Sequence, residues 1–236
     1  MEQTMNDQAA VIRTEGITKD YSENGVPVRA LRGIDMRIEP GEFTAIVGPS
    51  GSGKTTFLNI ISGLDTATAG SVWLAGKLLS DLSGRELSDF RRDHIGFVFQ
   101  AYNLIPVLSV AENVEYIMLL QGVPADERRR RVEAMLAPLG LSGMADRRPT
   151  QLSGGQQQRA AIARAMVAQP SLILADEPTA NLDSATAVDL IEMMRKLNED
   201  TGMTFVFSTH DPRIMERARR LIVLVDGQID RDETPG

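Results

Sequence analysis

The feature that most constrains this chain is a glycine-rich loop placed between a strand signal and a helix signal. The apolar run Phe43 to Val47 precedes the loop, and the helical stretch Thr56 to Ser62 follows it. The loop itself reads Gly48-Pro49-Ser50-Gly51-Ser52-Gly53-Lys54-Thr55-Thr56. Strand, glycine-rich loop and helix in this order are typical of a phosphate-binding P-loop. Glycines let backbone N–H groups turn toward an anion, and the helix N-terminus adds a favourable dipole.

The charged and hydroxyl residues of the loop have separate expected roles. We expect Lys54 to reach the β- and γ-phosphates of a nucleotide, Thr55 to hold Mg²⁺ through its hydroxyl, and Thr56 to meet the α-phosphate. A glycine-rich surface turn is the alternative interpretation. The flanking strand and helix favour the phosphate site.

A second motif supports a nucleotide site. The run Leu172-Ile173-Leu174-Ala175-Asp176-Glu177 is apolar and ends in two carboxylates. Such a run is typical of a parallel strand buried on both faces, and ligands bind beyond the carboxyl ends of these strands. We expect Asp176 to lie beside the Mg²⁺ held by Thr55, and Glu177 to face the water that attacks the γ-phosphate. Without the P-loop, an ordinary solvated strand end would be the better interpretation.

Composition limits the remaining function classes. The chain has 236 residues, 42% of them hydrophobic, which is enough for one large α/β domain with a subdomain. A formal charge of -7 argues against a broad nucleic-acid surface, and the absence of cysteine excludes disulfides and thiolate metal sites. Met1 to Ala10 does not match a secretory signal, and apolar runs such as Leu221 to Val225 are shorter than the ~20 residues of a spanning helix. We therefore expect an intracellular protein without a membrane span.

The order of elements predicts an alternating α/β fold. Further strands are expected at Val11–Tyr21, Val28–Ile38, Ser71–Leu74, Ile95–Phe99, Thr204–Ser208 and Leu221–Val225. Between Ser109 and Gly140 the pattern becomes helical: Pro124 suits a helix start, and the positions i, i+3, i+4 and i+7 of one apolar face are Val132, Met135, Leu136 and Leu139. A second helical stripe runs from Ala187 to Leu197.

These elements predict a single nucleotide-binding domain over residues 1–236. We expect an α/β P-loop NTPase core with a mixed, mainly parallel sheet, an N-terminal antiparallel β subdomain and an inserted α-helical subdomain. The core would cover about 10–100 and 160–230, and the helical subdomain about 101–159. Gln100 and Pro149 would mark the two hinges.

Six motifs together resemble the nucleotide-binding subunits of ATP-binding cassette (ABC) transporters. The P-loop and the Asp176-Glu177 strand correspond to the family's Walker A and Walker B motifs. The others follow in the family's order: Gln100 after a strand, the signature Leu152-Ser153-Gly154-Gly155-Gln156, Asn181-Leu182-Asp183, and His210 after Phe205-Val206-Phe207-Ser208-Thr209. The resemblance spans nearly the whole chain.

This resemblance implies a homodimer with two ATP molecules between its subunits. The signature would read the γ-phosphate bound to the second subunit, through the Ser153 hydroxyl, the N–H groups of Gly154 and Gly155, and the positive end of a helix starting near Gln156. Such an interface is isologous. Asn181 and Asp183 would lie at this interface.

The resemblance also implies the catalytic roles. Glu177 would be the general base or water-orienting carboxylate, His210 would contact the γ-phosphate, and Gln100 would touch Mg²⁺ and the attacking water. A lone histidine at a strand end is more often structural, so the role of His210 depends on the other motifs. Tyr21 would stack on adenine, although a tyrosine closing an early strand is as often a packing residue.

Two segments look most like the lipoprotein-release (LolD) and macrolide-exporter (MacB) branch: Asp176 to Asp183, and Asn103 to Val114. This implies an ATPase at the cytoplasmic face of the inner membrane that drives integral permease subunits, with no nucleic-acid partner. The rivals are an FtsE-like regulator of cell division, a family member in DNA repair or iron–sulfur assembly without a membrane partner, and a binding switch that hardly hydrolyses ATP. Glu177 disfavours the switch, and the short cysteine-free chain disfavours DNA repair.

Two further segments have the composition of possible contact surfaces. Ala101 to Val110 is apolar for a loop, which predicts either a groove for a short cytoplasmic helix of the permease, lined by Leu104 and Leu108, or packing beneath the helical subdomain. Arg128 to Arg131 is the densest basic run. We interpret it mainly as a solvated helix face, with contact to anionic headgroups as the alternative.

Overall fold

The computed structural model describes residues 10–23 and 26–234, so most of Met1 to Ala10 lies outside the described residues. A six-stranded sheet forms the centre of the fold, in the order β10-β9-β3-β8-β7-β6. Its strands are β3 (Phe43–Val47), β6 (Ile95–Phe99), β7 (Leu172–Asp176), β8 (Thr204–Thr209), β9 (Arg220–Val225) and β10 (Gln228–Glu233). All neighbours pair in parallel except the β9–β10 hairpin. The predicted mixed, mainly parallel sheet is thus confirmed.

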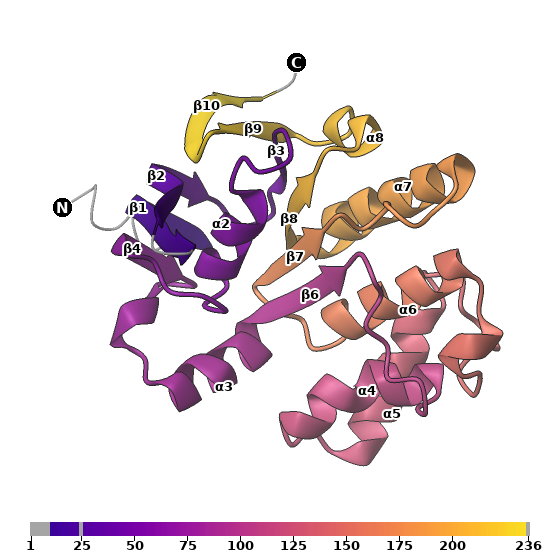
Figure 1. The fold of residues 1–236 in the computed structure, drawn as a ribbon. Coiled ribbons are helices and arrows are strands. Elements are labelled where there is room, and N and C mark those ends of the chain that lie inside the picture. Colours follow the sequence, from indigo (N-terminus) through magenta and orange to yellow (C-terminus); the bar gives the residue numbers. More distant parts are fainter. Residues whose placement is uncertain (1–9, 24–25, 235–236) are drawn as a thin grey trace.

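A second sheet of four antiparallel strands has the order β2-β1-β4-β5. Its strands are β1 (Ile12–Glu23), β2 (Val26–Ile38), β4 (Ala69–Leu74) and β5 (Lys77–Leu78). These form the predicted N-terminal antiparallel unit. Figure 1 shows this sheet beside α2.

The helices cover both faces of the central sheet, with α2 packing on one face and α6 and α7 on the other. Their bounds are α2 (Lys54–Ile61), α3 (Gly84–His94), α4 (Val110–Leu120), α5 (Ala125–Leu136), α6 (Gly154–Met166), α7 (Ser184–Thr201) and α8 (Pro212–Met215), with short 3₁₀ turns at Leu79–Asp81 and Pro149–Gln151. Figure 1 shows α4, α5 and the start of α6 grouped beyond the β6 edge. This group is the predicted helical insertion, and Pro124 is the residue that precedes α5.

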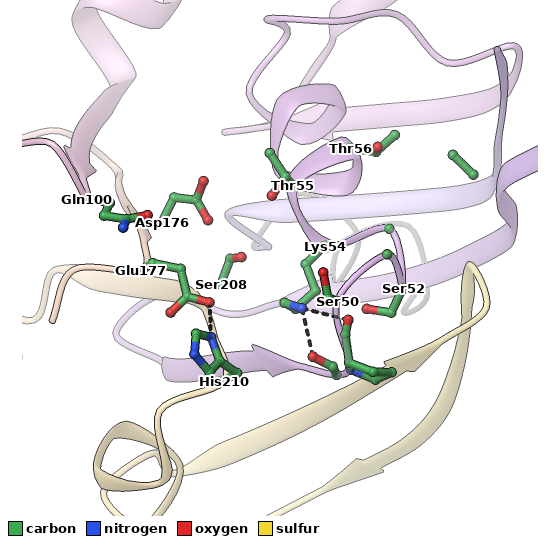
Figure 2. Close-up of a pocket in the computed structure, with 15 residues that line it drawn as sticks. Ser50, Ser52, Lys54, Thr55, Thr56, Gln100, Asp176, Glu177, Ser208 and His210 are labelled. Atoms are coloured by element: carbon green, nitrogen blue, oxygen red, sulfur yellow. Dashed lines mark hydrogen bonds and ion pairs between the residues drawn. The ribbon is translucent and has the colours of Figure 1, made fainter. Parts of the chain in front are cut away.

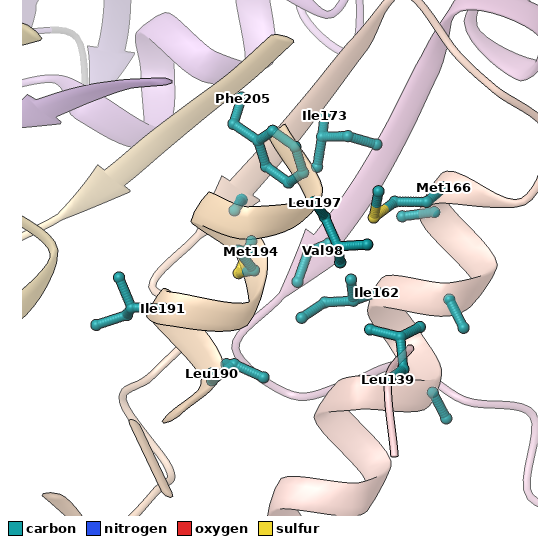
Figure 3. Packing of buried hydrophobic residues seen from close by; sticks show 14 of the residues in the cluster. Val98, Leu139, Ile162, Met166, Ile173, Leu190, Ile191, Met194, Leu197 and Phe205 are labelled. Atoms are coloured by element: carbon teal, nitrogen blue, oxygen red, sulfur yellow. The ribbon is translucent and has the colours of Figure 1, made fainter. Parts of the chain in front are cut away.

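Successive side chains of the central strands point to opposite faces of the sheet, and an apolar core forms on each face. On β8, Phe205 and Phe207 point into the larger core, whereas Val206 points into the other. Both faces are covered, so the strands read as continuous apolar runs. Figure 3 shows α6 and α7 packing onto this larger core through Ile162, Met194 and their neighbours.

The close approach of α6 to the sheet depends on one glycine of β6. A Cβ atom at Gly96 would lie 2.3 Å from the carbonyl oxygen of Ala165 on α6 and 2.6 Å from Ile173 Cδ1 on β7. No larger residue fits there. The strand that leads to Gln100 is therefore in direct contact with the helix that begins at the signature segment.

Candidate functional site

The carboxyl ends of β3, β7 and β8 surround a cavity of about 740 Å³. Figure 2 shows the side chains that converge on it from these separate parts of the chain. Every predicted P-loop residue from Gly48 to Thr56 lines this cavity, and so do Gln100, Asp176, Glu177 and His210. The cavity also contains Ala30 and Ser208, which the sequence analysis did not identify.

The P-loop is held by glycines that have no room for a side chain. Gly48 has φ 154°, and a Cβ there would lie 2.0 Å from the carbonyl oxygen of Leu224 on β9. Gly53 has φ 100°, a left-handed conformation that favours glycine, and a Cβ there would lie 2.7 Å from the carbonyl oxygen of Ala30. The loop can curve around an anion because its backbone packs directly on β9 and β2.

Polar groups of the loop face the cavity. Lys54 Nζ donates hydrogen bonds of 2.7 Å to the carbonyl of Gly48 and 3.1 Å to that of Pro49. Ser52 is 2% exposed, and its hydroxyl has no hydrogen-bond partner among the described residues. An ammonium that bonds carbonyls of its own loop, together with a buried hydroxyl that lacks a partner among the described residues, suits an anionic ligand with several oxygens.

Asp176 is the half-buried carboxylate of the cavity. Burial raises its pKa, the neighbouring charge of Glu177 acts in the same direction, and Ser208 and Lys54 act against them. Its strand partner is Ser208, which explains how Ser208 reaches the cavity. Carboxyl ends of adjacent parallel strands meet at one edge, and this rule is the signal that could have predicted Ser208.

Glu177 follows Asp176 in a left-handed backbone conformation, with φ 46°. Its Oε1 lies 2.6 Å from His210 Nδ1, and its Oε2 accepts a hydrogen bond of 3.0 Å from the Thr209 hydroxyl. The side chain of His210 is 76% exposed, whereas that of Glu177 is 18% exposed. The pair therefore joins a sheltered carboxylate to an imidazole that is open to solvent (Figure 2).

The signature segment does not line this cavity. Ser153 is the N-cap of α6: its hydroxyl accepts from Gln156 N, and Gln156 Oε1 accepts from Ser153 N. The helix begins at Gly154, slightly earlier than the predicted start near Gln156, because this reciprocal capping box closes the first turn. The first N–H groups of a helix lack partners within it, so Gly154 and Gly155 present donors at this end.

The segments around Gln100, the signature and Asn181 are in contact with one another. Asn181 Nδ2 donates to the Gln100 carbonyl at 2.9 Å. A Cβ at Gly155 would lie 2.5 Å from Thr186 Cγ2, and Thr186 donates to Asp183, the N-cap of α7. Asn181 thus lies beside Gln100, Asp183 lies near the signature helix through Thr186, and neither lines the cavity.

Tyr21 also lies outside the cavity lining. Its hydroxyl donates to Asp65 Oδ2 at 2.8 Å, and Lys19 Nζ lies 4.9 Å from the ring centroid. Burial raises the pKa of this phenol, and the hydrogen bond with Asp65 acts in the same direction. With 37% of its surface exposed, the ring remains open to a ligand, and the predicted adenine contact stays a prediction.

A second, smaller groove of about 260 Å³ lies between β6, α4 and α6. Its lining is largely apolar and includes Phe97, Phe99, Tyr116 and Ile117, together with Arg164. Arg164 donates to the carbonyls of Tyr102 and Asn103, so it connects α6 to the loop after Gln100.

The apolar loop Ala101 to Val110 contributes less to this groove than the sequence predicts. Only Asn103 of Ala101 to Val110 lines it. Leu104 packs against the larger core, whereas Val107 is 72% exposed. Asn113 is buried and holds the loop through hydrogen bonds with the backbone of Ile105. Packing beneath the helices therefore accounts for Leu104.

The described residues offer neither a membrane span nor a ready-made metal cluster. No helix of residues 10–23 and 26–234 is both long and apolar enough to span a membrane. Within the same residues, no three His, Cys, Asp or Glu side chains gather in a way that could hold a metal ion by themselves.

Comparison with known proteins places the chain in a family. A family model described as ABC transporter matches residues 31–180. The chain is 48% identical over 226 residues to the macrolide export ATP-binding/permease protein MacB of Brucella melitensis, a match that covers 96% of this chain and 35% of that protein. It therefore spans about a third of the length of that relative. The MacB name agrees with the branch that the sequence motifs indicated.

A second relative matches over nearly its full length. The ABC transporter ATP-binding protein MJ0796 of Methanocaldococcus jannaschii is 44% identical over 227 residues, covering 94% of this chain and 97% of that protein. A solved structure titled as dimeric MJ0796, a bacterial ABC transporter cassette, has a TM-score of 0.86 and covers 95% of this chain and 99% of its own. Another is titled as a dimeric post-hydrolysis state of MJ0796 bound to ADP and Pi, also with a TM-score of 0.86. The chain therefore belongs to the ABC transporter family and has the fold of its ATP-binding cassettes.

Proposed function

We propose that this chain is an ATP-hydrolysing nucleotide-binding subunit of an ABC transporter. The observation that carries the proposal is the convergence of the P-loop with Asp176, Glu177 and His210 on one cavity. Phosphoryl transfer to water requires a phosphate-binding loop, an acidic group that holds a cation, and a carboxylate that positions the water. The relative that is solved with ADP and Pi supports the same chemistry.

The cavity suits a nucleotide with its magnesium ion. Mg²⁺ is usually bound by one or two carboxylates together with substrate phosphates and water, so a site without a cluster of acidic residues fits it. Asp176, the Thr55 hydroxyl and Gln100 would hold the ion. When bound, Mg²⁺ would neutralise charge on the β- and γ-phosphate oxygens. A bound cation would favour the ionised form of Asp176 and so oppose the effect of burial, which raises its pKa.

In the proposed reaction Glu177 accepts the proton of the attacking water or orients that water. The carboxylate is sheltered, and its two oxygens are bound by His210 and Thr209, which limits its rotation. His210 would contact the γ-phosphate from its exposed position. Lys54 would leave the carbonyls of its own loop and pair with the phosphates, where its charge stabilises the transition state.

We further propose that two copies of the chain close around two ATP molecules. The signature carries free helix N–H groups and the Ser153 hydroxyl, yet it lies outside the cavity of its own chain. A partner's signature could complete that cavity in an isologous dimer. Both solved MJ0796 structures are described as dimers, which supports this arrangement. ATP would then favour the dimer by mass action, and hydrolysis would remove that bias.

We propose that the partner is an integral membrane permease and that the chain works at the cytoplasmic face of the inner membrane. The name of the MacB relative joins ATP-binding and permease functions. We propose that a short helix of the permease docks in the groove lined by Phe97, Phe99 and Tyr116, because this groove is apolar and reaches the loop after Gln100 through Arg164. We likewise propose that the helical subdomain begins near residue 101 and ends near residue 159. The second boundary falls within α6.

The proposal is tested with the purified chain. We expect phosphate release that requires both ATP and Mg²⁺, together with ATP-dependent dimers of a hydrolysis-deficient variant in size-exclusion chromatography. Absence of both at high protein concentration would contradict it.

A further inference from the structure

The loops that follow β7 and β8 are joined by two hydrogen bonds that run in opposite directions. Thr209, at the end of β8, donates from its hydroxyl to Glu177 Oε2 at 3.0 Å. Thr179, two residues after Glu177, donates from its hydroxyl to Asp211 Oδ2 at 2.5 Å. Each loop therefore supplies one hydroxyl donor and one carboxylate acceptor. We call Thr209 and Thr179 the crossed hydroxyl pair.

The direction of the Thr209 bond is fixed by its surroundings. The backbone N–H of Asp211 donates to the Thr209 hydroxyl oxygen at 3.0 Å, so the hydroxyl proton is available for Glu177. Thr209 is 0% exposed, and water does not compete for this proton. A hydroxyl that receives one bond and gives one bond has a single preferred orientation.

Asp211 is held equally firmly. Arg213 contacts both of its carboxylate oxygens through Nε, and Arg213 Nη2 adds a bond of 2.7 Å to Oδ2. An acceptor that stays ionised keeps the Thr179 hydroxyl as a donor. Thr179 is 1% exposed, so this second half of the pair is also sheltered.

Glu177 has an uncommon backbone conformation, and neighbouring contacts hold both its backbone and its side chain. A φ of 46° is uncommon for a residue with a long side chain, and such a conformation persists where surrounding contacts fix it. The Glu177 N–H donates to the Ser208 carbonyl at 2.9 Å, which fixes the backbone. Thr209 fixes one carboxylate oxygen, and the other is left to His210 and to the cavity.

We propose that Thr209 is a positioning residue for Glu177, supported by the reciprocal bond of Thr179, and that without its hydroxyl the carboxylate turns away from the reacting water. The inference rests on the proposed function, since it needs ATP hydrolysis to be observed. Thr209 itself does not line the cavity. It acts through Glu177 and has no direct contact with a ligand.

The test replaces Thr209 with a residue of nearly the same shape. Thr209→Val should lower kcat at least about tenfold, the size expected for losing one hydrogen bond to a charged group. The KM for ATP and the Kd for a fluorescent ATP analogue should stay within about twofold of the parent values, because the P-loop is untouched. Thr209→Ser, which keeps the hydroxyl, should restore most of kcat.

A second readout distinguishes positioning from a general structural role. In the Glu177→Gln background, Thr209→Val should change the residual rate by less than about threefold, because residues that act as a unit are not additive. The matched control is Thr204→Val, which removes the hydroxyl that accepts from Gly41 N at the other end of β8. It should leave kcat unchanged.

The outcomes separate this inference from the proposed function. A parent chain that releases no phosphate contradicts the proposed function itself. If the parent is active and a folded Thr209→Val variant has the same kcat, this inference alone is overturned. It is also overturned if Thr209→Val lowers the rate of the Glu177→Gln variant by the same factor as it lowers the rate of the parent. Should Thr209→Val fail to fold, Thr179→Val takes its place: a severalfold fall in kcat supports the crossed hydroxyl pair, and a parental kcat overturns it.

Discussion

Glu177 Oε1 and His210 Nδ1 lie 2.6 Å apart, although the two residues come from different strand ends and differ greatly in exposure. The parallel register of β7 and β8 produces this contact, because it aligns Asp176 with Ser208 and brings the residues that follow them together. The geometry of the proposed catalytic pair therefore depends on sheet pairing.

Replacing Glu177 with glutamine should separate ATP binding from hydrolysis. We expect Glu177→Gln to lower the rate of phosphate release by about a hundredfold or more, the lower end of what positioned proton transfer contributes. The Kd for ATP should be unchanged, and ATP-bound dimers should accumulate in size-exclusion chromatography. Glu199→Gln, which neutralises an exposed glutamate paired with Arg219, is the control. A Glu177→Gln variant with the parental rate would contradict the assigned role.

Removing the ammonium of Lys54 should weaken nucleotide binding itself. Lys54→Ala deletes the charged group that bonds Gly48 and Pro49 at the cavity, so isothermal titration with ATP should show a higher Kd. Lys196→Ala removes the same group from an exposed site on α7 and should leave the Kd unchanged. Equal Kd values for both variants would argue against the phosphate contact.

Ser153 should matter for hydrolysis beyond its role as a helix cap. The same capping box occurs at Ser109 on α4, so Ser153→Ala and Ser109→Ala should each lower the free energy of unfolding by about 1 kcal/mol. Only Ser153→Ala should also reduce ATP-dependent dimerisation and turnover. Urea titrations and phosphate release measure the two effects. Similar turnover in both variants would remove the proposed contact of Ser153 with ATP.

Charging the groove should uncouple the permease from the ATPase. Tyr116 is 39% exposed and lines the groove, so Tyr116→Glu should reduce co-purification with membranes and leave basal ATP hydrolysis intact. Leu64→Glu changes a residue that is 52% exposed outside the groove and serves as the control. Charging Leu104 is a poorer test, because this side chain packs against the core. Loss of membrane association in both glutamate variants would speak against a groove-specific partner.

Asp211 should give the folded state a dependence on acid pH. Burial acts to raise its pKa, but hydrogen bonds from Arg213 and Thr179 outweigh burial and lower the pKa from 3.8 to about 2. A folded-state pKa below the unfolded value stabilises the protein above about pH 4, and this contribution is lost as the pH falls toward about 2. Asp211→Asn should therefore lower the free energy of unfolding near neutral pH by about 1 to 2 kcal/mol. Urea titrations should show this difference shrinking below about pH 4, and a pH-independent difference would contradict the assignment.

The strands of the parallel sheet could be predicted closely because both faces are buried. Phe43–Val47 and Ile95–Phe99 have the predicted bounds, since an apolar run flanked by glycine or polar residues leaves little choice of register. The strand β10 was missed, because its exposed polar residues carry no apolar pattern. It is held by pairing with β9 and by the ion pair of Asp232 with Arg220.

The helical prediction was right in position and less accurate at the ends. The apolar stripe from Val132 to Leu139 continues beyond α5, which ends at Leu136, because Leu139 is buried from the following turn. Periodicity reports which side chains are buried and gives no direct information on where backbone hydrogen bonds stop. The motif residues of the site could be predicted because their residue types and spacing indicate their chemistry. Ala30 and Thr209 could not be predicted, because only the folded chain brings Ala30 to the cavity and Thr209 to Glu177.

The turn between β9 and β10 reaches back to the P-loop. Gly227 N donates to the Ser52 carbonyl, and the Gly227 carbonyl accepts from Arg32 N, so one residue near the C-terminus joins the P-loop to β2. A truncation after Asp226 would remove no side chain that lines the cavity, yet it would release the loop from its backing and expose the edge of β9. Shortened variants that lack Gly227 would therefore weaken phosphate binding from a distance, through the lost bonds to Ser52 and Arg32.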